Sequence, residues 1–209
     1  MKIVITGHTK GLGKKLYDHF VKDPNNTVIG FSRSQGTDIK TSIDSVIAAA
    51  ENCDLFISNA YADRRQIELV KHLNNQVKML VVSGSQGGFF NDLIPTDYGK
   101  NKKDLAEVCH LISLDKNSKT KILHLDLSCL EGNIVDIDDP NNLKCDYTIS
   151  FDEVVDTVDF WIRNPSFNNV RFNFKITDLL YDQISTKMKT KPQLDQLVDR
   201  IKQAVDKSV

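Results

Sequence analysis

Two residues in the middle of the chain have the types and the spacing for acid–base chemistry. Tyr98 and Lys102 are four positions apart, which places both side chains on one face of a helix, one turn apart. A free phenol has a pKa near ~10, too high for easy proton exchange at neutral pH, and a neighbouring ammonium favours the phenolate. Tyr98 is therefore a candidate proton donor to a carbonyl oxygen, and a candidate base in the reverse direction.

A serine further upstream strengthens this pattern. Five tyrosines in a lysine-rich chain give about a two-in-five chance that one has a lysine four positions later, so the pair alone carries little weight. Ser85 lies thirteen residues before Tyr98 and follows a predicted strand, where its hydroxyl could hold a substrate oxygen beside the phenol. Ser83 is the alternative, and a serine at the end of a strand commonly only forms a turn.

A glycine-rich turn near the N-terminus is a candidate phosphate site. Gly7, Gly11 and Gly13 lie between the apolar run 3–5 and an amphipathic stretch. A strand, turn and helix of this kind present free backbone N–H groups and the helix dipole to an anion, and glycines let the backbone approach a pyrophosphate. Without the flanking strand and helix, the glycines would indicate only an ordinary turn.

The residues after the second predicted strand bear on the choice of nucleotide. In dinucleotide-binding folds an acid about 20 residues past the turn holds the ribose 2′-OH, whereas an arginine accommodates a 2′-phosphate. Here Arg33 lies between Ser32 and Ser34, and Lys10 is a second cation in the glycine turn. A guanidinium can bind a phosphate through two hydrogen bonds, which favours NADPH; the alternative is that Arg33 is a solvated surface charge.

Together these motifs resemble the short-chain dehydrogenase/reductase family. The run Thr6-Gly7-x3-Gly11-Leu12-Gly13 is similar to the cofactor motif of its compact members, and Ser85, Tyr98 and Lys102 follow in the family's order. The resemblance implies that these three residues are catalytic and that Lys102 also bonds the nicotinamide ribose. It implies NADP(H) as cofactor, with no metal, held by Gly7, Thr9, Lys10, Gly11, Leu12, Gly13, Ser32, Arg33, Ser34, Asp38, Asn59, Ala60, Tyr98 and Lys102.

The chain departs from the family pattern at three places. The stretch from Asn59 to Ser85 is much shorter than usual, as though one helix were missing. The asparagine that completes the family's catalytic set on that helix has no clear counterpart, and Gln66 is the candidate stand-in. After the strand at 121–127, Leu-Ser-Cys-Leu stands where the family usually carries Pro-Gly. These departures bear on the rate and the proton relay more than on the fold.

Short apolar runs alternate with helical patterns, which predicts an α/β fold: a Rossmann-like doubly wound parallel sheet. We expect a catalytic domain at residues 1–181, then a linker and a C-terminal helix at 182–209. Residues 86–97 and Tyr61 should wall the substrate pocket, and 128–149 should form a short lid. Strands are expected at 2–6, 27–31, 37–39, 54–58, 78–83, 121–127 and from 170, and helices at 11–22, 42–52, 64–73, 97–114 and from 150.

The composition excludes several other classes. A formal net charge of −1 over 209 residues gives no electrostatic footprint for nucleic acid. No apolar run reaches the roughly 18 residues that span a bilayer, so we expect no membrane partner. Four scattered cysteines without a C-x-x-C pair indicate a reduced, cytoplasmic protein.

The sequence therefore predicts an NADPH-dependent oxidoreductase that reduces a ketone or aldehyde by reversible hydride transfer. Two alternatives stay open: a non-catalytic dinucleotide-binding sensor or scaffold, which the shortened catalytic region makes plausible, and a nucleotide-sugar epimerase or dehydratase. The second of these would need a separate sugar-nucleotide domain, for which the chain is short. The expected partners are a small carbonyl or alcohol substrate and further copies of the chain, as a homodimer or homotetramer.

Overall fold

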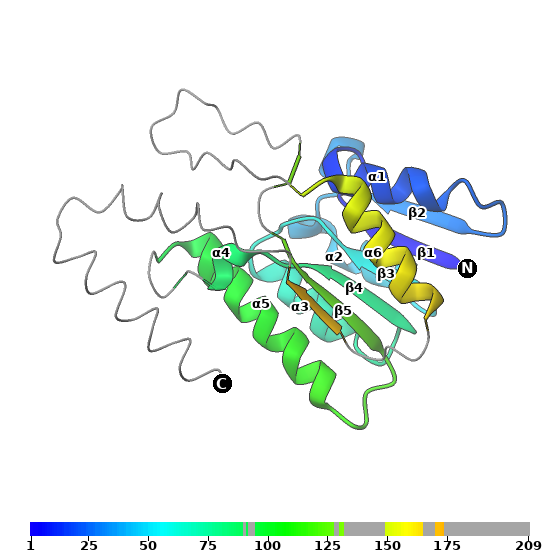
Figure 1. Cartoon of the computed structure of the whole chain (residues 1–209). Coiled ribbons are helices and arrows are strands. Elements are labelled where there is room, and N and C mark those ends of the chain that lie inside the picture. The colour runs from blue at the N-terminus through cyan, green and yellow to red at the C-terminus, as the bar shows by residue number, and fades with distance from the viewer. Residues whose placement is uncertain (90, 92–94, 128–129, 132–148, 165–169, 174–209) are drawn as a thin grey trace, which may run out of the picture.

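Six parallel strands form one sheet with helices on both of its faces (Figure 1). The computed structural model describes residues 1–89, 91, 95–127, 130–131, 149–164 and 170–173. The strands are β1 (Lys2–Thr6), β2 (Thr27–Phe31), β3 (Leu55–Ser58), β4 (Met79–Ser83), β5 (Lys121–Asp126) and β6 (Val170–Asn173). The helices are α1 (Gly11–Phe20), η1 (Arg33–Gln35), α2 (Ile39–Ala50), α3 (Arg64–Leu73), α4 (Gln86–Phe89), α5 (Asp97–Leu114) and α6 (Phe151–Arg163).

The strand order is β2-β1-β3-β4-β5-β6, so the direction of winding changes at β1. In register, Val4 of β1 lies between Ile29 of β2 and Phe56 of β3. Ligands in open parallel sheets bind beyond the carboxyl ends of the strands, at the point where the winding reverses. The carboxyl ends of β1, β2 and β3 are therefore the place to look for a site.

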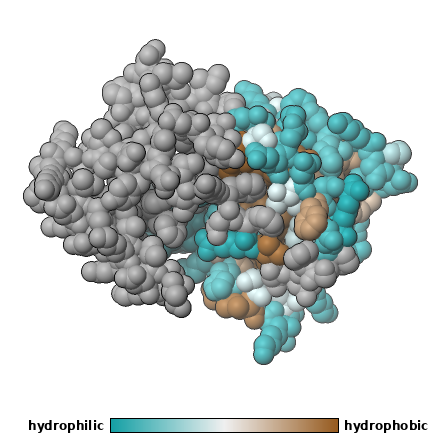
Figure 2. All heavy atoms as spheres, in the orientation of Figure 1, coloured by the Kyte–Doolittle hydropathy of each residue, from teal (hydrophilic) through white to brown (hydrophobic). Residues whose placement is uncertain are grey.

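The alternation of side chains along the strands divides the core into two apolar clusters. Ile3 and Ile5 of β1 pack in the cluster that α1 and α6 cover, whereas Val4 packs in the cluster that α2, α3 and α5 cover. Both faces of the central strands are buried, which is the pattern of a parallel sheet covered on both sides. Figure 2 shows that the described surface on the viewed side is mostly hydrophilic, with smaller apolar areas.

Most of the predicted elements are confirmed, several with identical bounds. The strands at 2–6 and 27–31 and the helices at 64–73 and 97–114 begin and end where the sequence pattern places them. The capping box of α6 is present, with Ser150 and Glu153 bonding each other's backbone N–H groups. The α/β doubly wound class is therefore confirmed.

The predicted strand at residues 37–39 is wrong. The side chain of Asp38 accepts a hydrogen bond from the backbone N–H of Lys40 and caps α2, so Ile39 is the first helical residue. Ile39 is 4% exposed and packs in the cluster under α2 rather than on a sheet edge. The capping bond and the burial of Ile39 thus outweigh the local preference for an extended chain.

The expected C-terminal helix, the linker and most of the expected lid lie outside the described residues. Within the ranges that the structure describes, no helix has both the length and the apolar character needed to cross a membrane.

Hydrogen bonds close the carboxyl ends of three strands onto one another. Thr6 Oγ1 donates to the carbonyl of Ile57 at 3.3 Å and accepts from the N–H groups of Asn59 and Ala60 at 3.0 and 3.2 Å. Asn59 Oδ1 in turn accepts from Ser83 Oγ at 3.1 Å. The ends of β1, β3 and β4 are therefore fixed relative to one another by buried or half-buried side chains.

The glycine turn between β1 and α1 packs tightly on this network. Gly7 has φ of 75°, in the left-handed region, and its carbonyl oxygen would be 2.1 Å from a Cβ at Gly13. Asn59 Nδ2 would be 2.6 Å from that same Cβ. Position 13 therefore has no room for any side chain.

We expect Gly13→Ala to lower the free energy of unfolding by at least about 3 kcal/mol, because the methyl group would meet backbone that cannot move away. Gly11→Ala is the matched control, since its Cβ would have nothing nearer than 3.6 Å and only its φ of 52° is unfavourable. That control should lose about 1–2 kcal/mol. Urea denaturation of both variants measures the difference, and equal losses would contradict the packing.

Candidate active site

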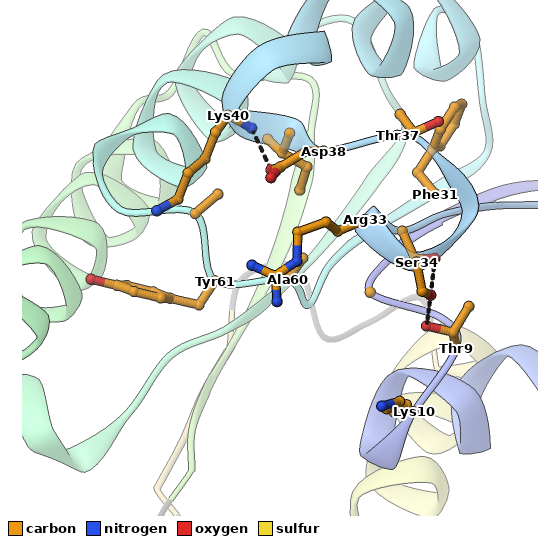
Figure 3. A pocket seen from close by; sticks show the side chains of 14 residues that line it. Thr9, Lys10, Phe31, Arg33, Ser34, Thr37, Asp38, Lys40, Ala60 and Tyr61 are labelled. Carbon is orange, nitrogen blue, oxygen red and sulfur yellow. Dashed lines mark hydrogen bonds between the residues drawn. The ribbon is translucent and has the colours of Figure 1, made fainter.

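A hollow of about 310 Å³ opens beyond the carboxyl ends of β1, β2 and β3 (Figure 3). Its walls come from the glycine turn, from η1, from the beginning of α2 and from the segment after β3. Eight residues predicted to bind a cofactor line it, namely Gly7, Thr9, Lys10, Ser32, Arg33, Ser34, Asp38 and Ala60. Phe31, Thr37, Ile39, Lys40, Tyr61 and Ala62 complete the lining.

The end of the hollow beside α1 is suited to an anion. Lys10 precedes the helix with an extended backbone, and among the described residues no side chain caps the helix and no acid lies in its first turn. The first N–H groups of a helix lack intrahelical partners and carry the positive end of its dipole. With the exposed Lys10 ammonium beside them, they can hold a phosphate.

Hydroxyl groups and a guanidinium surround the position that follows β2. The hydroxyls of Thr9 and Ser34 are 3.0 Å apart, and those of Ser34 and Ser32 are 3.1 Å apart, so one chain of hydrogen bonds joins the glycine turn to β2. Figure 3 shows the Arg33 side chain extending from η1 toward the segment of Ala60 and Tyr61. Arg33 and the hydroxyls of Thr9, Ser32 and Ser34 thus lie where β2 ends, while Lys10 and Asp38 lie elsewhere in the same lining.

An ion pair that the sequence analysis missed lies at the opposite wall. Lys40 Nζ is 2.5 Å from Asp63 Oδ2. This ion pair joins the beginning of α2 to the residue before α3. The pair raises the pKa of Lys40 and lowers that of Asp63. Asp63 has φ of 48°, which is unusual for a residue with a side chain. No sequence motif joins these two residues, because they meet only once the two helices are placed.

Six predicted cofactor residues are outside the lining of the hollow; Tyr98 and Lys102 belong to α5, and the other four lie around the glycine turn. Asn59 packs beneath the glycine turn, where its Nδ2 would be 3.1 Å from a Cβ at Gly7. Leu12 is 4% exposed and belongs to the core under α1, while Gly11 and Gly13 form the helix start behind the turn. These residues shape the turn, and its backbone faces the hollow.

Glycines bring the predicted catalytic serine and tyrosine together. A Cβ at Gly88 would be 2.7 Å from Lys103 N, and one at Gly99 would be 2.9 Å from the Gly87 carbonyl oxygen, so α4 lies directly against the backbone of α5. At Gly87, a Cβ would be 3.3 Å from Ser85 Oγ and 3.4 Å from Tyr98 Cε1. Ser85 and Tyr98 therefore flank the same small space.

The two candidate serines have different environments. Ser83 is 4% exposed and its hydroxyl is bonded to Asn59, so it belongs to the network that joins the strands. Ser85 is half-buried, and its Oγ accepts a hydrogen bond from Gly87 N at 3.1 Å. Of the two, Ser85 is the one beside Tyr98.

Lys102 lies one turn beyond Tyr98 and is almost completely buried, at 4% exposure. Its Nζ donates to the Ser83 carbonyl at 2.8 Å and to Gln66 Oε1 at 3.0 Å. Burial lowers the pKa of Lys102 from 10.5 to about 8, because the charged form loses its hydration. The ammonium lies 5.8 Å from the centre of the Tyr98 ring, within reach of a cation–π interaction.

Tyr61 joins the hollow to this second centre. It lines the hollow, its ring centre is 4.9 Å from that of Tyr98, and Lys102 Nζ is 5.5 Å from it. Its hydroxyl accepts a hydrogen bond from Asn101 Nδ2 at 3.2 Å. Tyr61 therefore packs against Tyr98, whereas Phe90 and residues 92–94 of the pocket wall that it was expected to face lie outside the described residues.

The protein was compared with known families, curated proteins and solved structures. No family model and no curated protein matches the sequence. The solved structures that match include a short-chain dehydrogenase/reductase superfamily protein of Agrobacterium tumefaciens with bound NAD. The fold is that of the short-chain dehydrogenases. The resemblance that the motifs indicated is thus confirmed at the level of the fold.

Two further matches are similar over most of the chain. The bulky-bulky ketone specific alcohol dehydrogenase of Comamonas testosteroni is 13% identical, with a TM-score of 0.63, covering 100% of this chain and 94% of that one. A small-chain dehydrogenase in complex with NADPH is also 13% identical, with a TM-score of 0.61, covering 83% of this chain and 96% of that one.

We expect the buried Lys102 to make stability depend on pH. The unfolded chain binds a proton at this lysine up to about pH 10.5, whereas the folded chain releases it near pH 8, so raising the pH through this window stabilises the fold. The gain should be on the order of 3 kcal/mol and should vanish in Lys102→Met.

Denaturant unfolding of wild type and variant across this pH range measures the difference between them. Lys100→Met, an exposed lysine on the same helix, is the control and should keep the wild-type dependence. A constant difference between wild type and Lys102→Met at every pH would show that Lys102 titrates normally.

Proposed function

We propose that the protein is an NADP(H)-dependent oxidoreductase of the short-chain dehydrogenase/reductase family that reduces a ketone or aldehyde. The observation that supports this most is the continuity of the site. An anion-binding hollow leads through Tyr61 to a place where Ser85, Tyr98 and Lys102 converge. This combination suits a nucleotide at one end and a carbonyl at the other.

The residues of the hollow fit a dinucleotide. The uncapped start of α1 suits a pyrophosphate, and Lys10 and Arg33 suit a 2′-phosphate, with Ser32 and Ser34 as further donors. Two of the similar structures contain NADPH or NADH, the latter a 3-alpha-hydroxysteroid dehydrogenase from Pseudomonas sp. B-0831. The proposed preference for NADP(H) over NAD(H) rests on the positive charges of Lys10 and Arg33.

The residues that line the hollow would hold the nicotinamide dinucleotide, which would supply the hydride in the proposed reaction. Ser85 Oγ holds the substrate oxygen, and the Tyr98 hydroxyl donates the proton that this oxygen needs as the alkoxide forms. Lys102 places a positive charge beside the phenol and stabilises the phenolate left behind. In the reverse direction Tyr98 takes the proton back from the alcohol. The proposal includes a small carbonyl or alcohol substrate and a homodimer or homotetramer in solution.

A non-catalytic dinucleotide-binding protein is the second candidate. It is favoured by the way Tyr61 packs against Tyr98 and Lys102, and by the protein groups that already occupy two donors of the lysine. Turnover of NADPH with a panel of ketones and aldehydes separates the candidates, because a sensor or scaffold binds the cofactor without oxidising it.

We expect wild type to bind NADPH more tightly than NADH, and Arg33→Ala to remove most of this preference. One lost charged hydrogen bond is worth roughly 1.5–3 kcal/mol, or about ten- to a hundredfold in affinity. Arg65→Ala, which removes an exposed arginine on α3, is the control and should leave both affinities unchanged. Fluorescence titration measures them, and equal affinity of wild type for the two cofactors would refute the assignment.

We expect Tyr98→Phe to lower kcat by about 10²–10⁴-fold, because the ring stays and the acid is removed, while NADPH affinity is retained. Tyr61→Phe is the matched comparison, since both phenols lie near Lys102, and it should keep most of the rate. The measurement is turnover of a carbonyl that wild type reduces. A Tyr98→Phe enzyme near the wild-type rate, or a collapse in Tyr61→Phe instead, would place the proton donor elsewhere.

A further inference from the structure

The Lys102 ammonium has neutral partners in a buried site. A buried charge is costly unless it is paired or bonded to polar groups. Among the residues that the structure describes, no carboxylate forms an ion pair with Lys102. Its two described acceptors are the backbone carbonyl of Ser83 and the side-chain oxygen of Gln66. Gln66 is therefore the side chain on which the charge depends.

Gln66 is held in one orientation. It is 1% exposed on α3, and its Nε2 donates to both the carbonyl and the Oγ of Ser58, at 3.1 and 3.2 Å. With both N–H groups directed to Ser58, the amide presents its oxygen to Lys102. The reversed amide would place N–H groups against an ammonium that can only donate.

Two buried titratable groups near Lys102, Cys109 and His124, supply no negative charge at neutral pH. Lys102 faces the ring of Tyr98 on α5, and on the same helix burial raises the pKa of the Cys109 thiol to about 12. His124 on β5 is buried and its pKa is lowered to about 4, so it is neutral. Tyr61 faces Lys102 with its ring. The carboxylate of Asp126 interacts with His124 and Cys109 and is bonded to Arg171.

We infer that Gln66 is a positioning residue: its amide oxygen fixes the Lys102 ammonium beside Tyr98 and keeps it protonated. An ammonium has three N–H donors, and Gln66 and Ser83 accept from two of them. Gln66 joins α3 to α5 through Lys102 and is anchored to the end of β3 through Ser58, so it sets where the charge lies relative to the phenol. The consequence for the reaction rests on the proposed function, whereas the effect on Lys102 does not.

The first test measures Lys102 itself, with no substrate or cofactor. Protein labelled with ¹³C- and ¹⁵N-lysine is titrated by NMR, and the Lys102 signal is assigned by its loss in Lys102→Met. Gln66→Met has similar length without an acceptor and should lower the Lys102 pKa by about one pH unit, the equivalent of one lost bond to a charge. Gln66→Glu keeps the shape and adds a charge, and should raise it above wild type.

Two more variants test whether a change in the Lys102 pKa comes from the contact with Gln66 or from a general loss of structure. Ser58→Ala retains Gln66 but removes the hydroxyl that accepts from its Nε2. This variant should lower the Lys102 pKa by less than Gln66→Met does. Thr120→Val is the matched control: Thr120 is 3% exposed and hydrogen-bonded to Val77 and Asn75 at the other end of the sheet. It should cost stability and leave the Lys102 titration unchanged.

The second test follows kcat against pH with a carbonyl substrate. In Gln66→Met, kcat should start to fall at a pH about one unit lower than in wild type. At pH 8 its kcat should therefore be about fivefold below that of wild type. Gln66→Glu should restore the rate, because it restores the protonated lysine. The KM for the carbonyl should change little in either variant, since Gln66 does not touch the substrate.

The outcomes separate this inference from the proposed function. The inference is overturned if the Lys102 pKa is unchanged in both Gln66→Met and Gln66→Glu. It is also overturned if Thr120→Val shifts the Lys102 pKa as much as Gln66→Met does. A titration that moves as expected in a protein that turns over no carbonyl supports the role of Gln66 and contradicts the oxidoreductase.

Discussion

Hydrogen bonds from Thr6 and Asn59 hold the carboxyl ends of β1, β3 and β4 together, and both halves of the site depend on them. On one side Asn59 supports the glycine turn, which sets the direction in which α1 begins. On the other side Asn59 bonds Ser83, whose carbonyl accepts from Lys102. A change at this network would therefore reach the anion site and the tyrosine together.

The buried Lys102 places a second constraint on the fold. Its charge needs acceptors, and these come from α3 and from the end of β4, so both elements must meet α5 at one atom. Burying the ammonium costs stability, and in the proposed reaction the same burial strengthens its charge near Tyr98, because a solvated lysine would be screened by water. Under the proposed function, catalysis and stability would therefore place opposite demands on this residue.

The sequence predicts local elements well and contacts between them poorly. The helix at 97–114 is predicted with its bounds, because its polar cap and its apolar period lie within one segment. The strand at 37–39 is wrong, because a single capping bond from Asp38 decides against it. The Lys40–Asp63 pair and the Gln66–Lys102 bond escape sequence analysis, since each joins two helices whose spacing no local pattern encodes.

The contact of α4 with α5 through Gly87, Gly88 and Gly99 has a consequence for how the site can be redesigned. Since backbone lies against backbone there, the packing that sets the main-chain positions of Ser85 and Tyr98 relative to each other does not depend on the rotamers of intervening side chains. Under the proposed function, substitutions in the surrounding loops would alter the shape that a carbonyl compound meets while the main-chain spacing of the two hydroxyl-bearing residues stays the same. Substrate range and catalytic geometry would then be separable traits.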